Sequence, residues 1–119
     1  AAIIARIPEN DVVVFATPLY FFGPTAQLKL IMDRMYSLFK FDYETGQIRH
    51  NLENLTFGLI ATAGADQFSA LEATFRLATG FMKNKFESLL IPFAGPSGSI
   101  QVNADARERA VAFGRKLAG

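Results

Sequence analysis

Three short apolar runs divide the chain, and each is continuous rather than alternating with polar residues. They span Asp11–Ala16, Leu55–Ala61 and Ser88–Ala94, and β-branched and aromatic residues are frequent in them. Continuous runs are typical of strands covered on both faces, as in parallel sheets flanked by helices. The third run contains Pro92, which has no N–H to donate to a neighbouring strand. We therefore expect three parallel strands, with the third at a sheet edge.

The intervening segments have the periodicity of amphipathic helices. One helix is predicted from Thr25 to Phe39. A second is predicted to begin at Ser69, whose hydroxyl would form a capping box with the carboxylate of Glu72, and a third begins after Asn103, a favourable N-cap. The stripes expected to face the sheet are Leu28, Met32, Met35 and Phe39, then Leu71, Phe75, Ala78 and Met82, then Ala106, Ala110, Phe113 and Leu117. Strands alternating with helices predict an α/β fold.

The composition fits one globular domain over residues 1–119, with 50% hydrophobic residues and a net charge of +1. This charge argues against a nucleic-acid partner. Because the chain has no cysteine, it has no disulfide, thiolate nucleophile or cysteine-ligated metal. The apolar runs are much shorter than the ~20 residues of a membrane span, and no signal-peptide pattern is present, so we expect no membrane association and a cytoplasmic protein. The chain starts with Ala1 rather than Met, as in a processed, trimmed or fragmentary product.

A long connection, Lys40–Asn54, contains a predicted turn at Glu44–Gln47 between two short extended pieces. It is either a surface excursion or a flap over a pocket or a subunit contact. The single histidine, His50, has no serine, cysteine or second histidine at a catalytic spacing. In the preceding helix, Lys29 and Asp33 have the i, i+4 spacing of a modest surface ion pair.

Ligands of open parallel sheets bind at the carboxyl ends of the strands, which directs attention to three loops. The first loop is unusually apolar and rigid, with aromatic residues and prolines in Ala16–Pro24, and it predicts a flat shelf for a planar aromatic ligand. Alternatively, its rings pack into the core or against another subunit. The second loop, Ala61–Asp66, has small residues that allow close backbone approach. The third, Ala94–Ser99, is interpreted as a plain loop.

The stretch Asp11–Arg34, with its Thr-Pro-Leu-Tyr turn and Lys-x-x-x-Asp-Arg helix, resembles flavodoxin-like NAD(P)H-dependent FMN reductases and NAD(P)H:quinone oxidoreductases. The resemblance implies a flavodoxin-like three-layer α/β/α fold with a parallel sheet, FMN as cofactor, and NAD(P)H and a small electron acceptor as partners. It implies that the isoalloxazine ring is lined by the first loop and that the second loop approaches its pyrimidine edge. The residues concerned are Thr17, Pro18, Leu19, Tyr20, Phe21, Phe22, Thr62, Ala63 and Gly64.

Members of that family begin with a strand and a Ser/Thr-rich loop that binds the FMN phosphate, and nothing in this sequence matches that loop. The domain is therefore expected to be truncated at its N-terminus, with Ala1–Ile7 as the tail of a preceding helix. The strand at Asp11–Ala16 would then be a bare sheet edge. Because unpaired strand edges pair readily with other chains, a homo-oligomer is expected.

The sequence is compatible with two alternative functions. In the first, the chain belongs to an enzyme that transfers hydride from a nicotinamide to FMN and onward to an acceptor; the flavin supplies the chemistry, so no side chain is assigned as acid or base. In the second, it is a non-catalytic interaction module. A phosphoacceptor receiver is disfavoured, because its third strand would end in an aspartate where this chain has Ala16-Thr17-Pro18.

Overall fold

The computed structural model, which describes residues 2–119, is built around a parallel sheet of three strands in the order β1-β4-β5. The strands are β1 (Val12–Pro18), β4 (Thr56–Thr62) and β5 (Lys85–Ile91). Their register is continuous, with Val12 opposite Thr56 and Thr56 opposite Lys85. The predicted α/β class and parallel sheet are confirmed.

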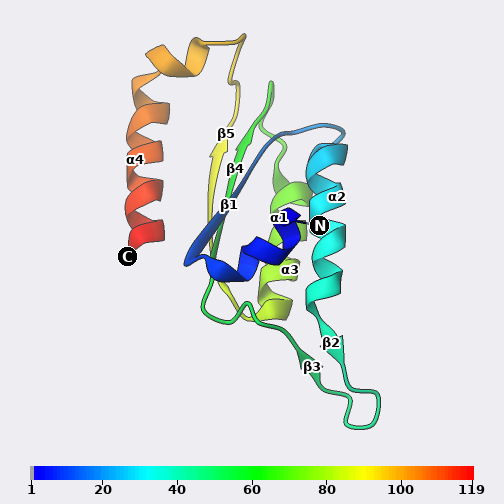
Figure 1. Cartoon of the computed structure of the whole chain (residues 1–119). Helices are drawn as coiled ribbons and strands as arrows, with labels where there is room; N and C mark the ends of the chain where they lie inside the picture. Colours follow the sequence, from blue (N-terminus) through cyan, green and yellow to red (C-terminus); the bar gives the residue numbers. More distant parts are fainter. Residues whose placement is uncertain (1) are drawn as a thin grey trace.

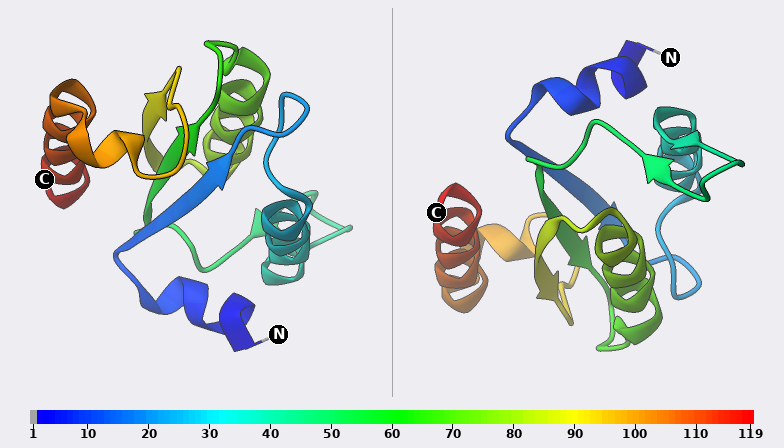
Figure 2. Two further views of the ribbon diagram at one scale, coloured as in Figure 1. Left: turned by 90° about the horizontal axis from the view of Figure 1, so that it is seen from above. Right: turned by 90° about the horizontal axis from the view of Figure 1, so that it is seen from below.

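Helices cover the two faces of the sheet and complete three layers (Figures 1 and 2). On one side lie α2 and α3, and on the other lies α4. The helical segments are α1 (Ala2–Arg6), η1 (Ile7–Glu9), α2 (Ala26–Arg34), η2 (Met35–Leu38), α3 (Ser69–Met82), η3 (Ser99–Val102) and α4 (Ala104–Ala118), where η marks 3₁₀ turns. The expected helix near the start of the chain is confirmed for residues 2–6, and Ala1 is outside the described residues. No helix within residues 2–119 is both long enough and apolar enough to span a bilayer.

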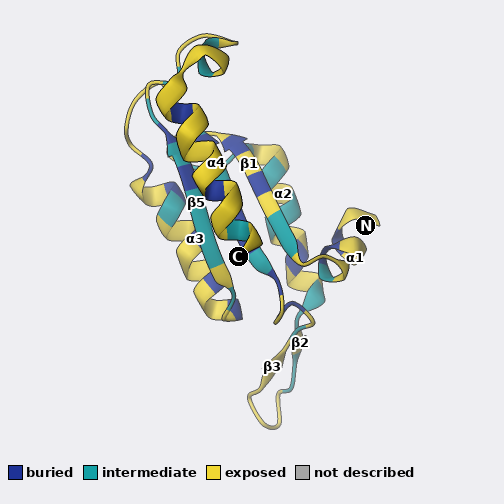
Figure 3. Cartoon of the chain, turned by 90° about the vertical axis from the view of Figure 1, so that its left-hand side faces the viewer, coloured by how far each residue is buried: buried dark blue, intermediate teal, exposed yellow. Residues whose placement is uncertain are grey.

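The main core lies between the sheet and the α2–α3 layer, and it includes the fully buried Phe57, Leu71 and Phe75. A smaller core lies beneath α4 (Figure 3). There Gly58 of β4 allows the close approach of the helix, because a Cβ at this position would be 3.1 Å from Phe113. A side chain at this position would therefore require Phe113 to shift by a few tenths of an ångström, which glycine avoids.

Strand β1 departs from the expectation of burial on both faces. Phe15 and Thr17 are buried, but Val14 is 41% exposed and Ala16 and Pro18 are also exposed. The reason is that α4 packs mainly on β5 and β4 and leaves the corresponding face of β1 largely open. The prediction was right for β4 and wrong for β1.

The third strand was predicted at Ser88–Ala94, but the structure has it three residues earlier, at Lys85–Ile91. It ends at Ile91, so Pro92 lies beyond it and is not the reason for its edge position. Strand β5 is nevertheless an edge strand, as expected. The chain leaves the strand direction at Phe93, whose φ of +52° is left-handed.

One of the two predicted helix caps is present: Asn103 caps α4 by accepting a hydrogen bond from the N–H of Ala106. Thr25 caps α2 in the same way, by accepting a hydrogen bond from the N–H of Leu28. The capping box at Ser69 is wrong, because Phe68 occupies the N-cap position and no side chain caps α3. The Glu72 carboxylate instead accepts a hydrogen bond from the Ser88 hydroxyl at 2.8 Å. The helix that starts at Thr25 ends earlier than expected, at Arg34, and continues as the 3₁₀ turn η2.

The apolar stripes are confirmed in part. Met35, Leu71, Phe75, Met82, Ala106 and Phe113 are buried, but Ala78 and Ala110 are exposed. On α3, Thr79 is buried, and its hydroxyl donates to the carbonyl of Phe75. A threonine bonded to its own helix is accommodated in the interior at little cost, which hydrophobic periodicity alone does not anticipate.

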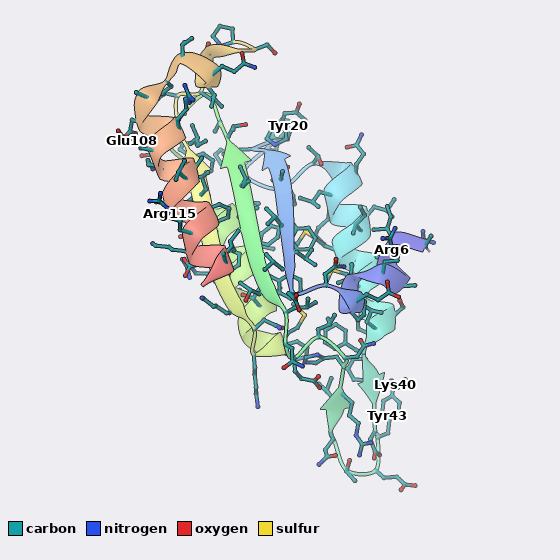
Figure 4. All side chains as sticks on the ribbon, turned by 60° about the vertical axis from the view of Figure 1, so that its left-hand side comes forward. Arg6, Tyr20, Lys40, Tyr43, Glu108 and Arg115 are labelled. Atoms are coloured by element: carbon teal, nitrogen blue, oxygen red, sulfur yellow. The ribbon has the colours of Figure 1, made fainter. Side chains whose placement is uncertain are left out.

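The long connection forms an antiparallel hairpin, β2 (Lys40–Phe41) with β3 (Ile48–Arg49). Its turn is held by the Asp42 carboxylate, which accepts hydrogen bonds from the N–H groups of Glu44 and Thr45 and consequently has a lowered pKa. The hairpin extends from the end of the molecule opposite the carboxyl ends of the strands (Figures 1 and 4). It is therefore not a flap over the loops that follow the strands.

Candidate functional site

The sheet register places the ends of all three strands at one level. Pro18 lies opposite Thr62, and Thr62 lies opposite Ile91. Hydrogen bonds continue beyond the strands: the N–H of Leu19 donates to the carbonyl of Thr62 at 2.8 Å, and the N–H of Ala63 donates to that of Ile91 at 3.2 Å. Because neighbouring strands are ~4.8 Å apart, the three loops start within about 10 Å of one another. The predicted site residues from the first two loops are thus brought together.

The first loop contains a tight turn, from Tyr20 to Gly23. The N–H of each of these residues donates to the carbonyl of the other, at 3.0 and 3.1 Å. Phe21 and Phe22, between them, have φ values of +47° and +66°. Two consecutive left-handed residues define the type I′ geometry, which usually takes Asn-Gly. Phenylalanine in such a conformation costs about 1–3 kcal/mol per residue, a strain that often marks a functional segment.

The aromatic rings of this turn face solvent. Phe21 is fully exposed, Tyr20 is 61% exposed and Phe22 is 56% exposed. Figure 4 shows Tyr20 beyond the tip of the β1 arrow. The alternative in which these rings pack into the protein's own core is therefore wrong. The rings form an aromatic shelf (Tyr20, Phe21 and Phe22) at the carboxyl edge of the sheet.

Thr17 has a different environment from the shelf. Its side chain is buried, and its hydroxyl accepts a hydrogen bond from the N–H of Thr25 at 3.1 Å and donates one to the carbonyl of Pro18 at 2.7 Å. These bonds join the end of β1 to the start of α2, across the base of the loop. Leu19 packs against the main core, whereas Pro18 is exposed. Thr17 and Leu19 thus anchor the loop from beneath.

The second loop offers backbone groups rather than side chains at the carboxyl edge of the sheet. Thr62 and Ala63 are half-buried, and Ala63 is held by its bonds to Ile91 and Ala94. Within residues 2–119 no hydrogen bond engages the N–H of Gly64 or Ala65. These two groups are therefore donors available at the carboxyl edge. A Cβ on Gly64 would meet nothing within 4 Å, so packing inside the chain does not require glycine there.

Phe93 is a further candidate at this edge that the sequence analysis missed. It follows β5, its φ is +52°, and it is 69% exposed. The next residue, Ala94, donates its N–H to the carbonyl of Ala63 at 2.9 Å, which places Phe93 beside the second loop. The available sequence signal was an aromatic residue directly after a proline at the end of a buried strand, a pattern related to that of the first loop.

The three loops are almost free of charge. Segments 17–24, 62–66 and 92–98 contain one acidic or basic residue, Asp66, which is exposed. An arrangement of exposed rings, open N–H donors and little charge suits an uncharged planar ring that carries hydrogen-bond acceptors on one edge. It offers little for acid–base or nucleophilic catalysis by side chains.

The family model of the flavodoxin-like fold matches residues 1–111. The chain belongs to this family. Its three strands, with helices on both faces, are the part of that architecture which the structure describes. The predicted resemblance to the flavodoxin-like reductases is confirmed at the level of the family. A comparison with curated proteins found no match.

Solved structures of similar shape carry this family's fold. The Trp repressor binding protein from Bacillus subtilis is 26% identical, with 94% of this chain and 73% of that chain covered and a TM-score of 0.78. The NADPH-quinone reductase from P. pentosaceus is 19% identical, covering 98% and 72%, with a TM-score of 0.70. An FMN-dependent NADH-azoreductase from Bacillus anthracis, solved with FMN, is 18% identical, covering 98% and 60%, with a TM-score of 0.71.

This flavodoxin-like chain also has a cavity of about 540 Å³ away from the carboxyl edge. It lies between α2 and α3, with Phe15 and Phe57 of the sheet as its floor. None of the nine residues predicted to contact flavin lines it. The aromatic shelf and this α2–α3 cavity are therefore separate features.

Proposed function

We propose that this chain is part of an FMN-dependent NAD(P)H oxidoreductase, which transfers a hydride from a nicotinamide to bound FMN and passes the electrons to a small acceptor such as a quinone or free flavin. One observation carries the proposal: an exposed aromatic turn is held in left-handed backbone at the carboxyl edge of a flavodoxin-like sheet. The similar structures of an NADPH-quinone reductase and of an FMN-dependent NADH-azoreductase in complex with FMN support it.

The residues at this edge fit the isoalloxazine ring. The aromatic shelf offers an apolar surface to a flat ring system, and the free N–H groups of Gly64 and Ala65 suit the carbonyl oxygens of its pyrimidine edge. The backbone of Thr62 and Ala63 lies directly before these donors and would approach the same edge of the ring. Thr17, bonded to the start of α2, keeps the loop in place when a ligand binds.

FMN, when bound, supplies the hydride and electron chemistry. The contribution of this chain is to orient the ring and to shield one side of it from water with the aromatic shelf. Backbone N–H donors near the pyrimidine edge also stabilise negative charge there without requiring a titrating side chain. This accounts for a site whose loops contain a single acidic or basic residue.

An FMN titration with two tyrosine variants tests the ring contact. Tyr20→Ala removes a shelf ring, whereas Tyr43→Ala removes an even more exposed ring from the hairpin at the opposite end of the molecule. We expect Tyr20→Ala to weaken FMN binding about fivefold to tenfold, since an aromatic contact contributes ~1 kcal/mol. Binding is measured by quenching of flavin fluorescence. Equal FMN affinities for the two variants, or no binding by the native chain, would contradict the proposal.

The reaction itself is tested by following NADH and NADPH oxidation at 340 nm with FMN and menadione present. Turnover that requires both FMN and protein, and that falls in the Tyr20→Ala variant but not in Tyr43→Ala, is the expected result. Turnover that is equal in both variants places the chemistry away from the shelf and overturns the assignment of the site.

The second candidate is a non-catalytic interaction module, and the open edge of β1 favours it. Within residues 2–119 this strand pairs with β4 alone, and Val14 is 41% exposed beside its free edge. A purified chain that is colourless, stays colourless after FMN addition and still self-associates would support this candidate over the reductase.

A further inference from the structure

The α2–α3 cavity has a composition that its position in the core does not require. All three methionines of the chain, Met32, Met35 and Met82, line it, as do six of the twelve phenylalanines. Methionine side chains are flexible and polarizable, and they are frequent at surfaces that adapt to varied apolar ligands. The three methionines also pack on the main core, so the same flexible side chains that fill the interior line the opening and can adapt to an occupant.

The polar side chains of the lining are already satisfied or face water. The hydroxyls of Thr74 and Thr79 donate to the carbonyls of Ala70 and Phe75 within α3, and Lys29 forms an ion pair with Asp33 at the rim. Tyr36, the remaining polar residue, is 67% exposed. An ordered water needs two to four polar partners, which such a surface supplies poorly. The cavity therefore favours an apolar occupant with no net charge.

Small side chains on α3 and the end of α2 leave the space of the cavity open. Ala78, Thr74 and Thr79 place small side chains on α3, and α2 gives way to a 3₁₀ turn at Met35, so the two helices do not fill the space over β1 and β4. One end is limited by Phe39, whose ring lies 5.8 Å from that of Phe81. The volume of about 540 Å³ lies within the range of small-molecule sites, roughly 300–1,000 Å³.

We propose that the α2–α3 cavity is a binding site for an uncharged, apolar aromatic molecule. This site is separate from the aromatic shelf, and it does not depend on the reductase assignment. The ligand is held by ring and thioether contacts rather than by buried hydrogen bonds. The opposite charges of the Lys29–Asp33 ion pair cancel at the rim, so no net charge is present there to attract an anion or a cation.

Binding of N-phenyl-1-naphthylamine, an uncharged dye that fluoresces in apolar surroundings, tests this proposal on the full chain. We expect one dye per chain. Ala78→Trp, which places a large ring in the cavity from an exposed helical position, should weaken binding at least about tenfold. Ala112→Trp, at an exposed position of α4 across the sheet, is the matched control and should leave the affinity unchanged. Circular dichroism establishes that both variants fold.

The three methionines give a second readout that needs no variant. With methyl-labelled methionine, addition of the dye should shift the signals of Met32, Met35 and Met82 in proportion to the fluorescence. Dye binding without these shifts, or equal affinity for the two tryptophan variants, would overturn the proposal. So would methionine signals that change with protein concentration while the dye is excluded, since a second copy of the chain would then occupy the cavity.

Discussion

Three phenylalanines, Phe21, Phe22 and Phe93, have left-handed backbone, and all three lie at the carboxyl edge of the sheet. They are also exposed, so contacts within the chain do not offset their conformational cost. Glycine or asparagine would adopt these conformations with less strain. The proposed flavin contact would account for bulky aromatic residues at Phe21 and Phe22 in spite of this strain.

Replacement of Phe21 by Asn and Phe22 by Gly tests whether these two phenylalanines lower the stability of the fold while they increase the affinity for FMN. Asn-Gly is the favoured pair for a type I′ turn, so the free energy of unfolding should rise by about 1–3 kcal/mol. FMN affinity should fall about tenfold or more, because two shelf rings are lost. Urea denaturation and flavin fluorescence give the two values. A variant with unchanged stability and unchanged FMN affinity would show that neither the strain nor the rings matter.

Asn84 links two distant segments of the chain. Its Nδ2 donates to the carbonyls of Leu52 and Leu55 at 2.5 and 2.9 Å, and so joins the end of α3 to the approach of β4. Both leucines are buried. Asn84→Ala should therefore lower the free energy of unfolding by about 2–3 kcal/mol, as two carbonyls lose their donor. Asn54→Ala, at an exposed neighbouring position, should change it by less than about 0.5 kcal/mol in the same urea titration.

The residue types of the shelf were evident in the sequence, but their geometry was not. The combination of Tyr20, Phe21 and Phe22 after a strand was sufficient to predict a site. Their left-handed φ values follow from the bond between Tyr20 and Gly23, which no periodicity reveals. Phe93 was missed because an apolar residue after Ile91 looks like a continued strand until its backbone conformation is known.

At the level of elements, the β2–β3 hairpin depends on Asp42. Bonds from the N–H groups of Thr45 and Glu44 stabilise the carboxylate and hold its pKa below the ordinary value of 3.8. Because the folded pKa is lowered, this stabilisation is present above the unfolded pKa and is lost as pH falls through the folded value. Carbon NMR of the Asp42 carboxyl group should show the lowered pKa, with hairpin amide signals shifting over the same pH range.

Two substitutions separate the charge of Asp42 from its hydrogen bonds. Asp42→Asn keeps an oxygen acceptor and should make the hairpin signals insensitive to acid, whereas Asp42→Ala should disorder the turn at every pH. Hairpin signals that titrate equally in the native chain and in Asp42→Asn would assign the acid response to another group.

Elements defined by local patterns were predicted well, and those that depend on tertiary contacts were not. The runs at β1 and β4 and the cap at Asn103 are local signals, and the structure confirms them. The Ser69–Glu72 motif failed because Glu72 bonds to Ser88 on a neighbouring strand. Likewise, an apolar run cannot show whether a helix covers one face of β1 or both.

For the whole molecule, the free edge of β1 predicts self-association, since an unpaired apolar strand readily pairs with another chain. Val14→Lys should increase the monomer fraction in sedimentation velocity, because a charged side chain beside the edge opposes strand addition. Val111→Lys introduces the same charge on an exposed part of α4 and should have no effect. A native chain that is monomeric at high concentration would show that this edge does not pair with another copy.

The hairpin turn lies at one end of a molecule whose dimensions are 54 × 32 × 26 Å, and the aromatic shelf lies at the other (Figure 4). Residues 43–47 are all exposed, and their backbone takes part in no sheet other than the hairpin's own. A cysteine introduced there would be the single thiol of the protein. Dyes or surface tethers can thus be attached at one defined point, remote from the loops where the cofactor is expected to bind.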